Sequence, residues 1–423
     1  MRILVVGNGA REDALVWRLA QSESCDAVFS TPGNAGTAAR GENWGIAATD
    51  SRKIVERAKG EKIDLVVLGP ETAIAAGVGD KLREAGFAVF GPNRSGGRLE
   101  SSKIFAKRFM ERHGIPTARG RAVHSLDQAL KVLEDWHGGV VIKADGLAAG
   151  KGVVVTDDIA SARVVLRDWY DNKRIPGGGV DVLLEEKLIG REISVFAIAD
   201  GRAMIPLAAA CDYKRAGDGD TGPNTGGMGA YSPLPWLPVG FVDEVIDTIA
   251  IPTVRTLAAE QTPFIGLLYC GLIITESGTR VIEFNARFGD PETQVVLPRL
   301  ITPLSGLLFA AASGELGGLA RPEFSTDVAV TVVLASEGYP ETPITGRTIS
   351  GVNAALAIPG VTVAHAATAL SGGALVAIGG RVLSIVATGS DFVEARSRAY
   401  LALQAIDLEG GQYRTDIALR VAE

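Results

Sequence analysis

The chain has 423 residues, too many for one hydrophobic core, so we expect about three to four domains. Hydrophobic residues make up 47% and charged residues 22%, as in soluble globular proteins, and the formal net charge is −7. No basic stripe is present and no apolar run reaches 18 residues, so we expect no nucleic-acid partner and no membrane span. Cys25, Cys211 and Cys270 are far apart and form no CxxC pair, which favours a cytoplasmic location and argues against a zinc site.

Short apolar runs alternate with helical stretches at the start of the chain. Residues 3–6, 65–68 and 89–92 are predicted strands, and residues 11–21 are a predicted helix. This alternation indicates βαβ units. We therefore predict an N-terminal Rossmann-like domain with a parallel sheet over residues 1–101.

A linker helix is expected next, over residues 102–120. Residues 121–189 then form a predicted small α+β lobe. Its strands, expected at 140–142, 153–156 and 181–184, are rich in β-branched residues, and a glycine-rich turn joins the first two.

The largest piece is predicted over residues 190–325. It contains a glycine-rich loop at 212–235, a helix at 241–260 and a hairpin of residues 267–275 with 280–284. A loop of that length is usually functional or disordered.

Residues 326–423 are predicted to be a small C-terminal α+β domain. We expect a strand at 328–335, a hairpin around Gly379-Gly380 and a helix at 392–406. The fold class is therefore α/β with α+β lobes.

The sequence GNGARE at Gly7 lies between a predicted strand and a predicted helix. Backbone N–H groups and the helix dipole favour an anion at such a turn. Glu12 replaces the third glycine of a dinucleotide fingerprint, which argues against NAD. A substrate phosphate and a plain structural turn both remain open.

The sequence KADGLAAGKG at Lys143 resembles a P-loop. The spacer between its glycines is one residue short, and Gly152 stands where a P-loop has Ser or Thr. Because it joins two strands, a glycine flap over a triphosphate fits it better. A surface hairpin is the alternative.

The sequence LLEEKL at Leu183 ends a strand in an acidic pair. It could be a hinge whose backbone binds an adenine edge and whose acid binds ribose hydroxyls. A solvated charged turn is the alternative.

The sequence VIEFNARFGDPE at Val281 begins as a strand. Glu283 and Asn285 are two residues apart, so both side chains face the same side. Oxygen ligands suit Mg²⁺, which also binds substrate phosphates. Arg287 continues this face and can pair with a carboxylate or a phosphate. The alternative is an exposed strand with alternating polar residues.

The segment 212–229 combines Lys214 and Arg215 with several glycines. It could clamp a phosphate or a carboxylate, or it could be a disordered tip. The four histidines lie outside every motif, and no GxSxG elbow occurs, which argues against histidine acid–base catalysis and a Ser-His-Asp triad. Positioning and charge neutralisation are then the expected source of catalysis, as in phosphoryl transfer.

Together these segments resemble the phosphoribosylamine–glycine ligases (glycinamide ribonucleotide synthetases) of the ATP-grasp superfamily. The resemblance covers nearly the whole chain. It rests on GNGARE at Gly7, PGNAGT at Pro32, LGPET at Leu68, KADGLAAGKGV at Lys143, DYKRAGDGDTGPNTGGMGAYSP at Asp212 and EFNARFGDPET at Glu283. It implies an ATP-grasp fold with residues 121–189 as a moving lid. The implied reaction belongs to de novo purine biosynthesis. It joins glycine to 5-phosphoribosylamine, giving glycinamide ribonucleotide, ADP and phosphate through a glycyl phosphate.

The resemblance also implies roles for particular residues. The metal, Mg²⁺ or Mn²⁺, falls to Glu283 and Asn285. The residues implied to bind ATP are Lys103, Lys143, Gly150, Lys151, Gly152, Glu185, Glu186, Leu188 and Glu192. The implied catalytic residues are Arg287, Lys214, Arg215 and Asp212. The residues implied to bind the other substrates are Asn8, Gly9, Arg11, Asn34, Glu71, Asn224, Gly226, Gly227, Met228, Asp290 and Glu292. Small molecules are the only expected partners, and the expected state is a monomer.

The chain departs from the family pattern at three positions. Ala10 and Asp13 replace the second glycine and the histidine of Gly-Gly-Arg-Glu-His, and Lys187 stands where a large apolar residue is common. The methyl group of Ala10 is expected to narrow the approach to that loop. The predicted strand 267–275 offers no carboxylate opposite Glu283, so ATP and water are expected to complete the metal site.

Three alternatives remain. Another ATP-grasp carboxylate–amine ligase would not depend on phosphoribosylamine. An inactive nucleotide-binding regulatory protein would be expected to lose the lysines and the metal face. A dehydrogenase would need the third glycine and a proton donor.

Overall fold

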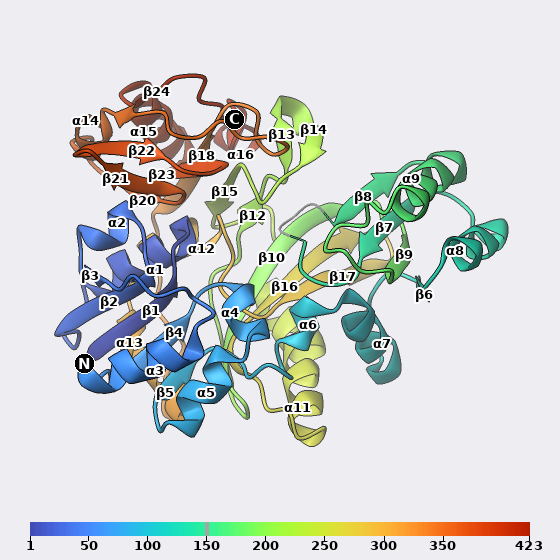
Figure 1. Cartoon of the computed structure of the whole chain (residues 1–423), viewed down its shortest axis with the longest axis horizontal. Coiled ribbons are helices and arrows are strands. Elements are labelled where there is room, and N and C mark those ends of the chain that lie inside the picture. The colour runs from blue at the N-terminus through green and yellow to red at the C-terminus, as the bar shows by residue number, and fades with distance from the viewer. Residues whose placement is uncertain (149–151) are drawn as a thin grey trace.

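A computed structural model describes residues 1–148 and 152–423. Gly150 and Lys151, both predicted to bind ATP, lie outside the described residues. Figure 1 shows the N-terminal domain in blue and the C-terminal domain in orange and red on one side of the molecule. A small lobe with strands β6 to β9 extends to the other side, and the long strands β10, β16 and β17 lie between.

The N-terminal sheet is parallel, as predicted, with the order β3-β2-β1-β4-β5. Its strands are Glu42–Asn43, Ala27–Pro32, Arg2–Gly7, Leu65–Leu68 and Ala88–Phe90. Side chains on both faces of β1 are buried, because Ile3 and Val5 join one hydrophobic core and Leu4 and Val6 join another. Burial on both faces is typical of parallel strands. The helices of this domain are α1 (Ala10–Leu19), α2 (Ala35–Ala38), α3 (Ser51–Gly60), α4 (Glu71–Ala75) and α5 (Val78–Glu84).

The small lobe is an antiparallel sheet of order β6-β9-β7-β8 with its own core. The strands are Gly120–Val123, Val182–Glu186, Val140–Ala144 and Val153–Thr156, and helices α8 (Leu126–Val132) and α9 (Ile159–Asp171) pack on them. Two helices, α6 (Arg98–Ser101) and α7 (Lys103–His113), connect the N-terminal domain to this lobe. The side chain of Ser102 caps α7 by accepting the N–H of Phe105.

The large lobe is built on an antiparallel sheet of order β11-β10-β16-β17, with strands Met204–Pro206, Arg191–Asp200, Ile265–Thr275 and Gly278–Asn285. The predicted hairpin is confirmed as β16 and β17. The predicted single helix at 241–260 is instead α10 (Phe241–Val245), a π-helical turn (Ile246–Ala250) and α11 (Ile251–Ala259). Pro252 explains the interruption, because proline has no N–H to donate to the preceding turn. Two further helices, α12 (Thr293–Val296) and α13 (Leu304–Ser313), follow β17.

The C-terminal sheet is antiparallel, with the order β12-β15-β18-β23-β20. Its strands are Cys211–Asp212, Gly229–Ser232, Val328–Ala335, Arg381–Gly389 and Val361–His365, and helix α15 (Phe392–Gln404) packs against β18 and β23. Strands β12 and β15 come from the segment predicted as a loop, so this sheet crosses the boundary expected at residue 326.

The segment 212–235, predicted as one long loop, therefore contains strands. Besides β12 and β15, the segment forms a hairpin of β13 (Arg215–Gly217) with β14 (Thr221–Asn224). Arg414 anchors this hairpin. The side chain of Arg414 is buried, pairs with Asp220 at 2.8 Å and donates to the carbonyl of Arg215 at 3.1 Å. Contacts with residues far along the chain, which local composition does not reveal, order the loop.

The position predicted for the C-terminal hairpin, around Gly379-Gly380, is wrong. The hairpin pairs β21 (Thr368–Ser371) with β22 (Ala374–Ala377), and the turn is Gly372-Gly373. Both turn glycines have positive φ, 57° and 82°, as a two-residue hairpin turn requires. At Gly380 a side chain would collide with the ring of Tyr339, so glycine there permits close packing.

Among the described residues, no helix is both long and apolar enough to cross a membrane.

Candidate active site

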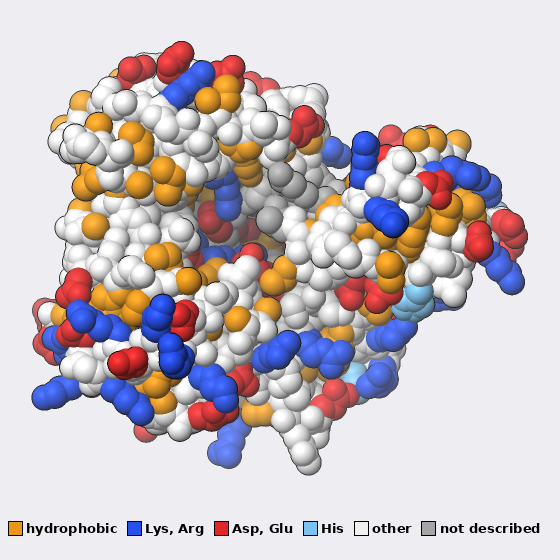
Figure 2. Space-filling view, in the orientation of Figure 1, with side chains coloured by type: hydrophobic (Ala, Val, Ile, Leu, Met, Phe, Trp, Pro, Cys, Tyr) orange, Lys and Arg blue, Asp and Glu red, His pale blue; other side chains and the backbone are white. Residues whose placement is uncertain are grey.

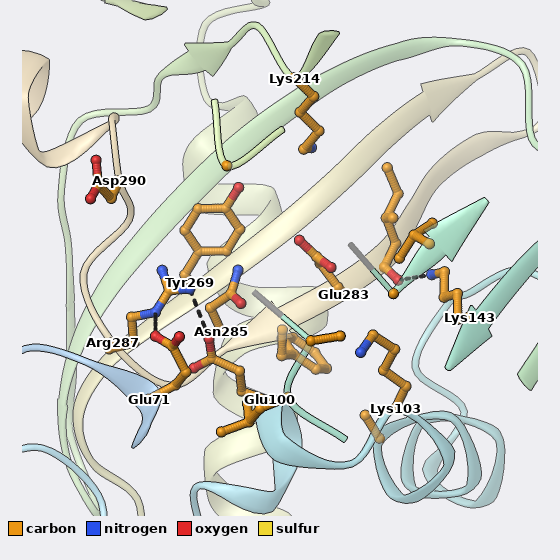
Figure 3. A pocket seen from close by; sticks show the side chains of 18 of the residues that line it. Glu71, Glu100, Lys103, Lys143, Lys214, Tyr269, Glu283, Asn285, Arg287 and Asp290 are labelled. Atoms are coloured by element: carbon orange, nitrogen blue, oxygen red, sulfur yellow. Dashed lines mark hydrogen bonds and ion pairs between the residues drawn. The ribbon is translucent and has the colours of Figure 1, made fainter. Parts of the chain in front are cut away.

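A cavity of about 420 Å³ lies where the domains meet. Figure 2 shows a hollow at the centre of the molecule with acidic and basic side chains at its floor. The N-terminal domain contributes Arg11 and Glu71, and the C-terminal domain contributes Tyr339 and Arg381. In Figure 3, Lys103 and Lys143 lie on one side, Arg287, Glu71 and Asp290 lie on the other, and Glu283 and Asn285 are between them.

The lysine side of the cavity is organised by Glu185, which lies on β9. Its carboxylate is 2.5 Å from the ammonium of Lys143 and 2.6 Å from that of Lys107 on α7. All three side chains are buried. Burial alone would raise the pKa of Glu185, but the two ammonium groups outweigh it and lower this pKa. Glu185 is therefore a carboxylate that fixes two lysines.

The base of the glycine flap is joined to α7. The carboxylate of Asp145 accepts the N–H of Ile104 at 3.1 Å, and Lys103 donates to the carbonyl of Gly146 at 2.9 Å. Burial lowers the pKa of Lys103, and Glu283 opposes this. These contacts keep Lys103 beside the start of the flap.

Glu283 and Asn285 both line the cavity, as the strand periodicity predicts, and Phe284 between them is buried in the core but also borders the cavity. Gly271 on β16 lies opposite Glu283, so the neighbouring strand supplies no carboxylate there. A side chain at Gly271 would lie 3.1 Å from Cγ of Glu283, so glycine leaves room for the carboxylate. Among the described residues, no group of three or more His, Cys, Asp or Glu side chains is placed to hold a metal.

Arg287 is held by two carboxylates from the preceding helices. Its guanidinium is 3.1 Å from Glu71 on α4 and 2.9 Å from Glu100 on α6, and Glu100 also accepts the N–H of Ala286 at 2.8 Å. Burial would raise the pKa of Glu71, but Arg287, with Arg11 adding to its effect, lowers that pKa to about 2. The ion pairs with Glu71 and Glu100 thus hold the guanidinium of Arg287 in place without a bound substrate.

A second group of charges lies around Lys214. Its ammonium is 2.8 Å from Glu192 and 3.6 Å from Asp212. Burial raises the pKa of Asp212 to about 7, although Lys214 opposes this. Nearby, the hydroxyl of Tyr269 donates to Glu292 at 2.9 Å, and Ser194 donates to the same carboxylate oxygen at 3.1 Å.

Glu12 fills the first glycine loop. Its carboxylate accepts the N–H of Gly9 at 2.6 Å and pairs with Arg11 at 2.6 Å. A side chain at Gly7 or Gly69 would collide with Glu12. The anion at the N-terminus of α1 is therefore the carboxylate of Glu12, which belongs to the chain itself.

The departures from the family pattern have structural roles. The methyl group of Ala10 packs with Ala364 and Ala366 of the C-terminal domain. Asp13 is buried, pairs with Arg40 at 2.6 Å and accepts the N–H of His365 at 2.7 Å. Lys187 pairs with Asp157 on the surface of the small lobe.

Asn34 connects the first loop to the C-terminal domain. Its side-chain oxygen caps α2 through the N–H groups of Gly36 and Thr37. Its side-chain nitrogen donates to the carbonyls of Asn8 and His365 at 3.0 and 2.6 Å. These bonds give the asparagine side chain a structural role that does not require contact with a substrate.

The structure brings many of the predicted site residues to the cavity. These are Arg11, Glu71, Lys103, Lys143, Gly152, Glu185, Asp212, Lys214, Gly226, Glu283, Asn285, Arg287, Asp290 and Glu292. Other predicted residues that the structure describes do not line it. These are Asn8, Gly9, Asn34, Glu186, Leu188, Glu192, Arg215, Asn224, Gly227 and Met228. Arg215 donates to Gly222 within its own hairpin, and Met228 is buried.

The sequence motifs missed some cavity residues. Glu100 lies two residues before the predicted linker helix, and Tyr269 lies two residues before Gly271 on the same strand face, so both had a weak positional signal. Lys107 lies one helical turn after Lys103 and reaches the site through Glu185. Tyr339 and Arg381 lie outside any motif, and only the tertiary fold brings them here.

Two antiparallel lobes around a cavity with lysines on one side and a carboxylate–amide face in the middle are the arrangement of an ATP-grasp ligase. The biotin carboxylase domain of 2-oxoglutarate carboxylase from Hydrogenobacter thermophilus shares the fold, with a TM-score of 0.73 at 17% identity over 97% of this chain and 91% of that one.

Residues 1–100, 101–293 and 329–420 match the N domain, the ATP-grasp (A) domain and the C domain of phosphoribosylglycinamide synthetase. A phosphoribosylamine–glycine ligase from Leifsonia xyli is 56% identical over 99% of this chain and 100% of its own length. The crystal structure of phosphoribosylamine–glycine ligase from Thermotoga maritima superimposes with a TM-score of 0.84 at 32% identity, over 98% of this chain and 100% of that one. The chain belongs to the phosphoribosylglycinamide synthetase family.

Proposed function

We propose that the chain joins glycine to 5-phosphoribosylamine and converts ATP to ADP and phosphate. The names of the relatives support this reaction. The structural observation that supports it is the cavity, which has Lys103 and Lys143 on one side and Arg287 on the other. Basic groups on the lysine side suit a triphosphate, and the guanidinium of Arg287 on the other side suits a small acid (Figure 3). One unit-charge contact at about 4 Å is worth roughly 4 kcal/mol at an effective dielectric of about 20.

ATP is assigned to the side of Lys103 and Lys143. The phosphates meet these two ammonium groups, and Glu185 keeps Lys143 oriented. The Hydrogenobacter structure of the same fold contains ADP as its magnesium salt, which supports the binding of an adenine nucleotide by this fold. The placement of adenine and ribose beside Glu185, Leu188 and Glu192 stays a prediction.

The residues of the middle face fit a divalent metal. Glu283 and Asn285 offer a carboxylate and an amide oxygen, and Gly271 leaves space around them. Such oxygens suit Mg²⁺ or Mn²⁺, which in this chemistry also binds phosphate oxygens. When bound, the metal neutralises charge on the triphosphate.

The reaction is proposed to have two steps. A carboxylate oxygen of glycine attacks the γ-phosphorus, and ADP leaves with the electrons of the broken bond. The amine nitrogen of phosphoribosylamine then attacks the carbonyl carbon of the glycyl phosphate, and phosphate leaves. Arg287, fixed by Glu71 and Glu100, orients the acid. We infer that Asp212, whose pKa burial raises to about 7, accepts the proton that the amine loses.

The test measures ADP release with ATP, Mg²⁺, glycine and freshly generated phosphoribosylamine. We expect release only when both glycine and the amine are present. With glycine labelled by ¹⁸O in its carboxylate, we expect the label in the released phosphate, because the second step breaks the carbon–oxygen bond. Release that does not require both substrates would contradict the proposed reaction, and unlabelled phosphate would contradict the glycyl phosphate.

A further inference from the structure

Arg381 reaches the cavity from strand β23 of the C-terminal domain. Its Nη1 donates to the carbonyls of Gly226 and Asp290 at 2.6 and 3.0 Å. Its Nη2 pairs with the carboxylate of Asp290 at 3.1 Å. One guanidinium thus joins two loops that are far apart in sequence, 212–228 and 285–292.

The peptide of Gly226 is held from both sides by the C-terminal domain. Arg381 binds its carbonyl, and the hydroxyl of Tyr339 accepts its N–H at 3.0 Å. A side chain at Gly226 would lie 3.0 Å from Cζ of Arg381, so the guanidinium packs directly on the glycine. The next residue, Gly227, has φ +107° and packs against Pro291, so the two loops also touch each other.

The carboxylate of Asp290 is held by more than one donor. One oxygen faces Arg381, and the other accepts from the side chain of Gln294 at 2.8 Å. Burial would raise the pKa of Asp290, but Arg381, followed by Arg11, lowers it. Asp290 is therefore an oriented anion, and Figure 3 shows it on the side of the cavity away from Lys103 and Lys143.

We propose that Arg381 is a positioning residue through which the C-terminal domain sets the affinity for the acid and the amine. It acts by fixing the carboxylate of Asp290 and the peptide of Gly226. ATP binds on the opposite side and does not depend on it. This inference rests on the proposed function, because that function assigns the two substrates to this side.

The experiment compares Arg381→Gln, Arg381→Lys, Asp290→Asn and the double variant Arg381→Gln/Asp290→Asn with the unmodified chain. The control is Arg398→Gln, because Arg398 is also in the C-terminal domain and pairs with Glu394 outside the cavity lining. For each protein we measure kcat, the KM of glycine, phosphoribosylamine and ATP separately, and the Tm.

We expect Arg381→Gln to raise the KM of glycine or of the amine by about tenfold or more, which is roughly 1.4 kcal/mol of lost binding. The KM of ATP should stay within about twofold, a change of less than roughly 0.5 kcal/mol. Arg381→Lys should recover only part of the loss, because an ammonium cannot reproduce the planar fork. Asp290→Asn should raise the KM of glycine or of the amine by a smaller factor in Arg381→Gln than in the unmodified chain, because the two residues act as one unit.

Two results would overturn the proposal. One is wild-type KM values for both glycine and the amine in Arg381→Gln. The other is an equal change in all three KM values with a lowered Tm, which indicates a merely structural role. If Arg381→Gln does not fold, Arg381→Lys is judged by the same criteria. The proposed function fails separately, when the unmodified chain shows no ADP release that depends on glycine and the amine.

Discussion

The carboxylate of Glu185 lies 2.5 Å from the ammonium of Lys143, and both side chains are almost completely buried. Its other oxygen is 2.6 Å from Lys107. One negative charge is therefore shared by two positive ones in the interior. The position of Lys143 in the cavity depends on this carboxylate, because Lys143 otherwise donates only to the carbonyl of Ile282 among the described hydrogen bonds.

We predict that Glu185→Gln destabilises the protein by about 3–5 kcal/mol, because two buried ammonium groups lose their partner. The KM of ATP should rise as well, since Lys143 is no longer fixed. Urea unfolding and steady-state ADP release measure the two effects. Glu111→Gln on the exposed face of α7 is the control and should change stability by about 0.5 kcal/mol or less.

Removing one of the two lysines sharpens this test. Glu185→Gln/Lys107→Met should be more stable than Glu185→Gln alone, because only one ammonium is then left unpaired. A double variant no more stable than Glu185→Gln would show that repulsion between the lysines is not the cause.

Glu283→Gln should lower turnover by orders of magnitude while the fold survives. The substitution keeps the size of the side chain and removes the negative charge that suits a divalent metal. Activity is measured as ADP release at several Mg²⁺ concentrations, and folding by the Tm. Glu276→Gln, at the exposed turn of the same hairpin, is the matched control. Unchanged turnover in Glu283→Gln would remove Glu283 as a metal ligand.

Asp13 should make the stability of the chain depend on pH. Burial is the main cause that raises the pKa of Asp13 from 3.8 to about 6, against the opposing effect of Arg40. This difference corresponds to about 3 kcal/mol. Because the folded state binds the proton more tightly, the stabilisation is complete below pH 3.8 and is lost as the pH rises through about 6.

The measurement is urea unfolding of the wild type and Asp13→Asn at pH 5 and pH 8. The wild type should gain stability relative to Asp13→Asn at the lower pH. His365 acts in the opposite direction, because burial lowers its pKa to about 4, but it is present in both proteins and so cancels in the comparison. Equal differences between the two proteins at both pH values would be incompatible with this role of Asp13.

Asn34→Asp should destabilise the protein by about 1–3 kcal/mol. The carboxylate still caps α2, but it faces the carbonyls of Asn8 and His365 without a donor. The Tm and the KM of phosphoribosylamine are measured together. A raised KM at an unchanged Tm would favour the substrate contact that the family resemblance implies.

Asn34→Ala provides the comparison, because it removes the cap as well as the donor. A lost N-cap costs about 1 kcal/mol. We therefore expect a lowered Tm in both variants.

Structural features that depend only on residues close together in the sequence were predictable. The strands at 65–68, 153–156 and 328–335 are confirmed residue for residue, because each apolar run is flanked by aspartate on one side and by glycine or serine on the other. The shared face of Glu283 and Asn285 follows from strand periodicity alone. The family follows from whole motifs, each of which is a contiguous stretch of the sequence.

Only the tertiary structure decided which charges meet. The sequence by itself determined the parallel sheet, the strands of the two lobes and the face shared by Glu283 and Asn285, because repeating apolar patterns and short motifs encode them locally. It did not determine the ion pairs of Glu185 with Lys107 or of Arg287 with Glu71 and Glu100, nor the role of Arg381. Those contacts join residues between 78 and 216 positions apart in the sequence. Arg381 also lies in the C-terminal domain, where no sequence motif was found. All of these contacts depend on how the separate sheets pack against one another.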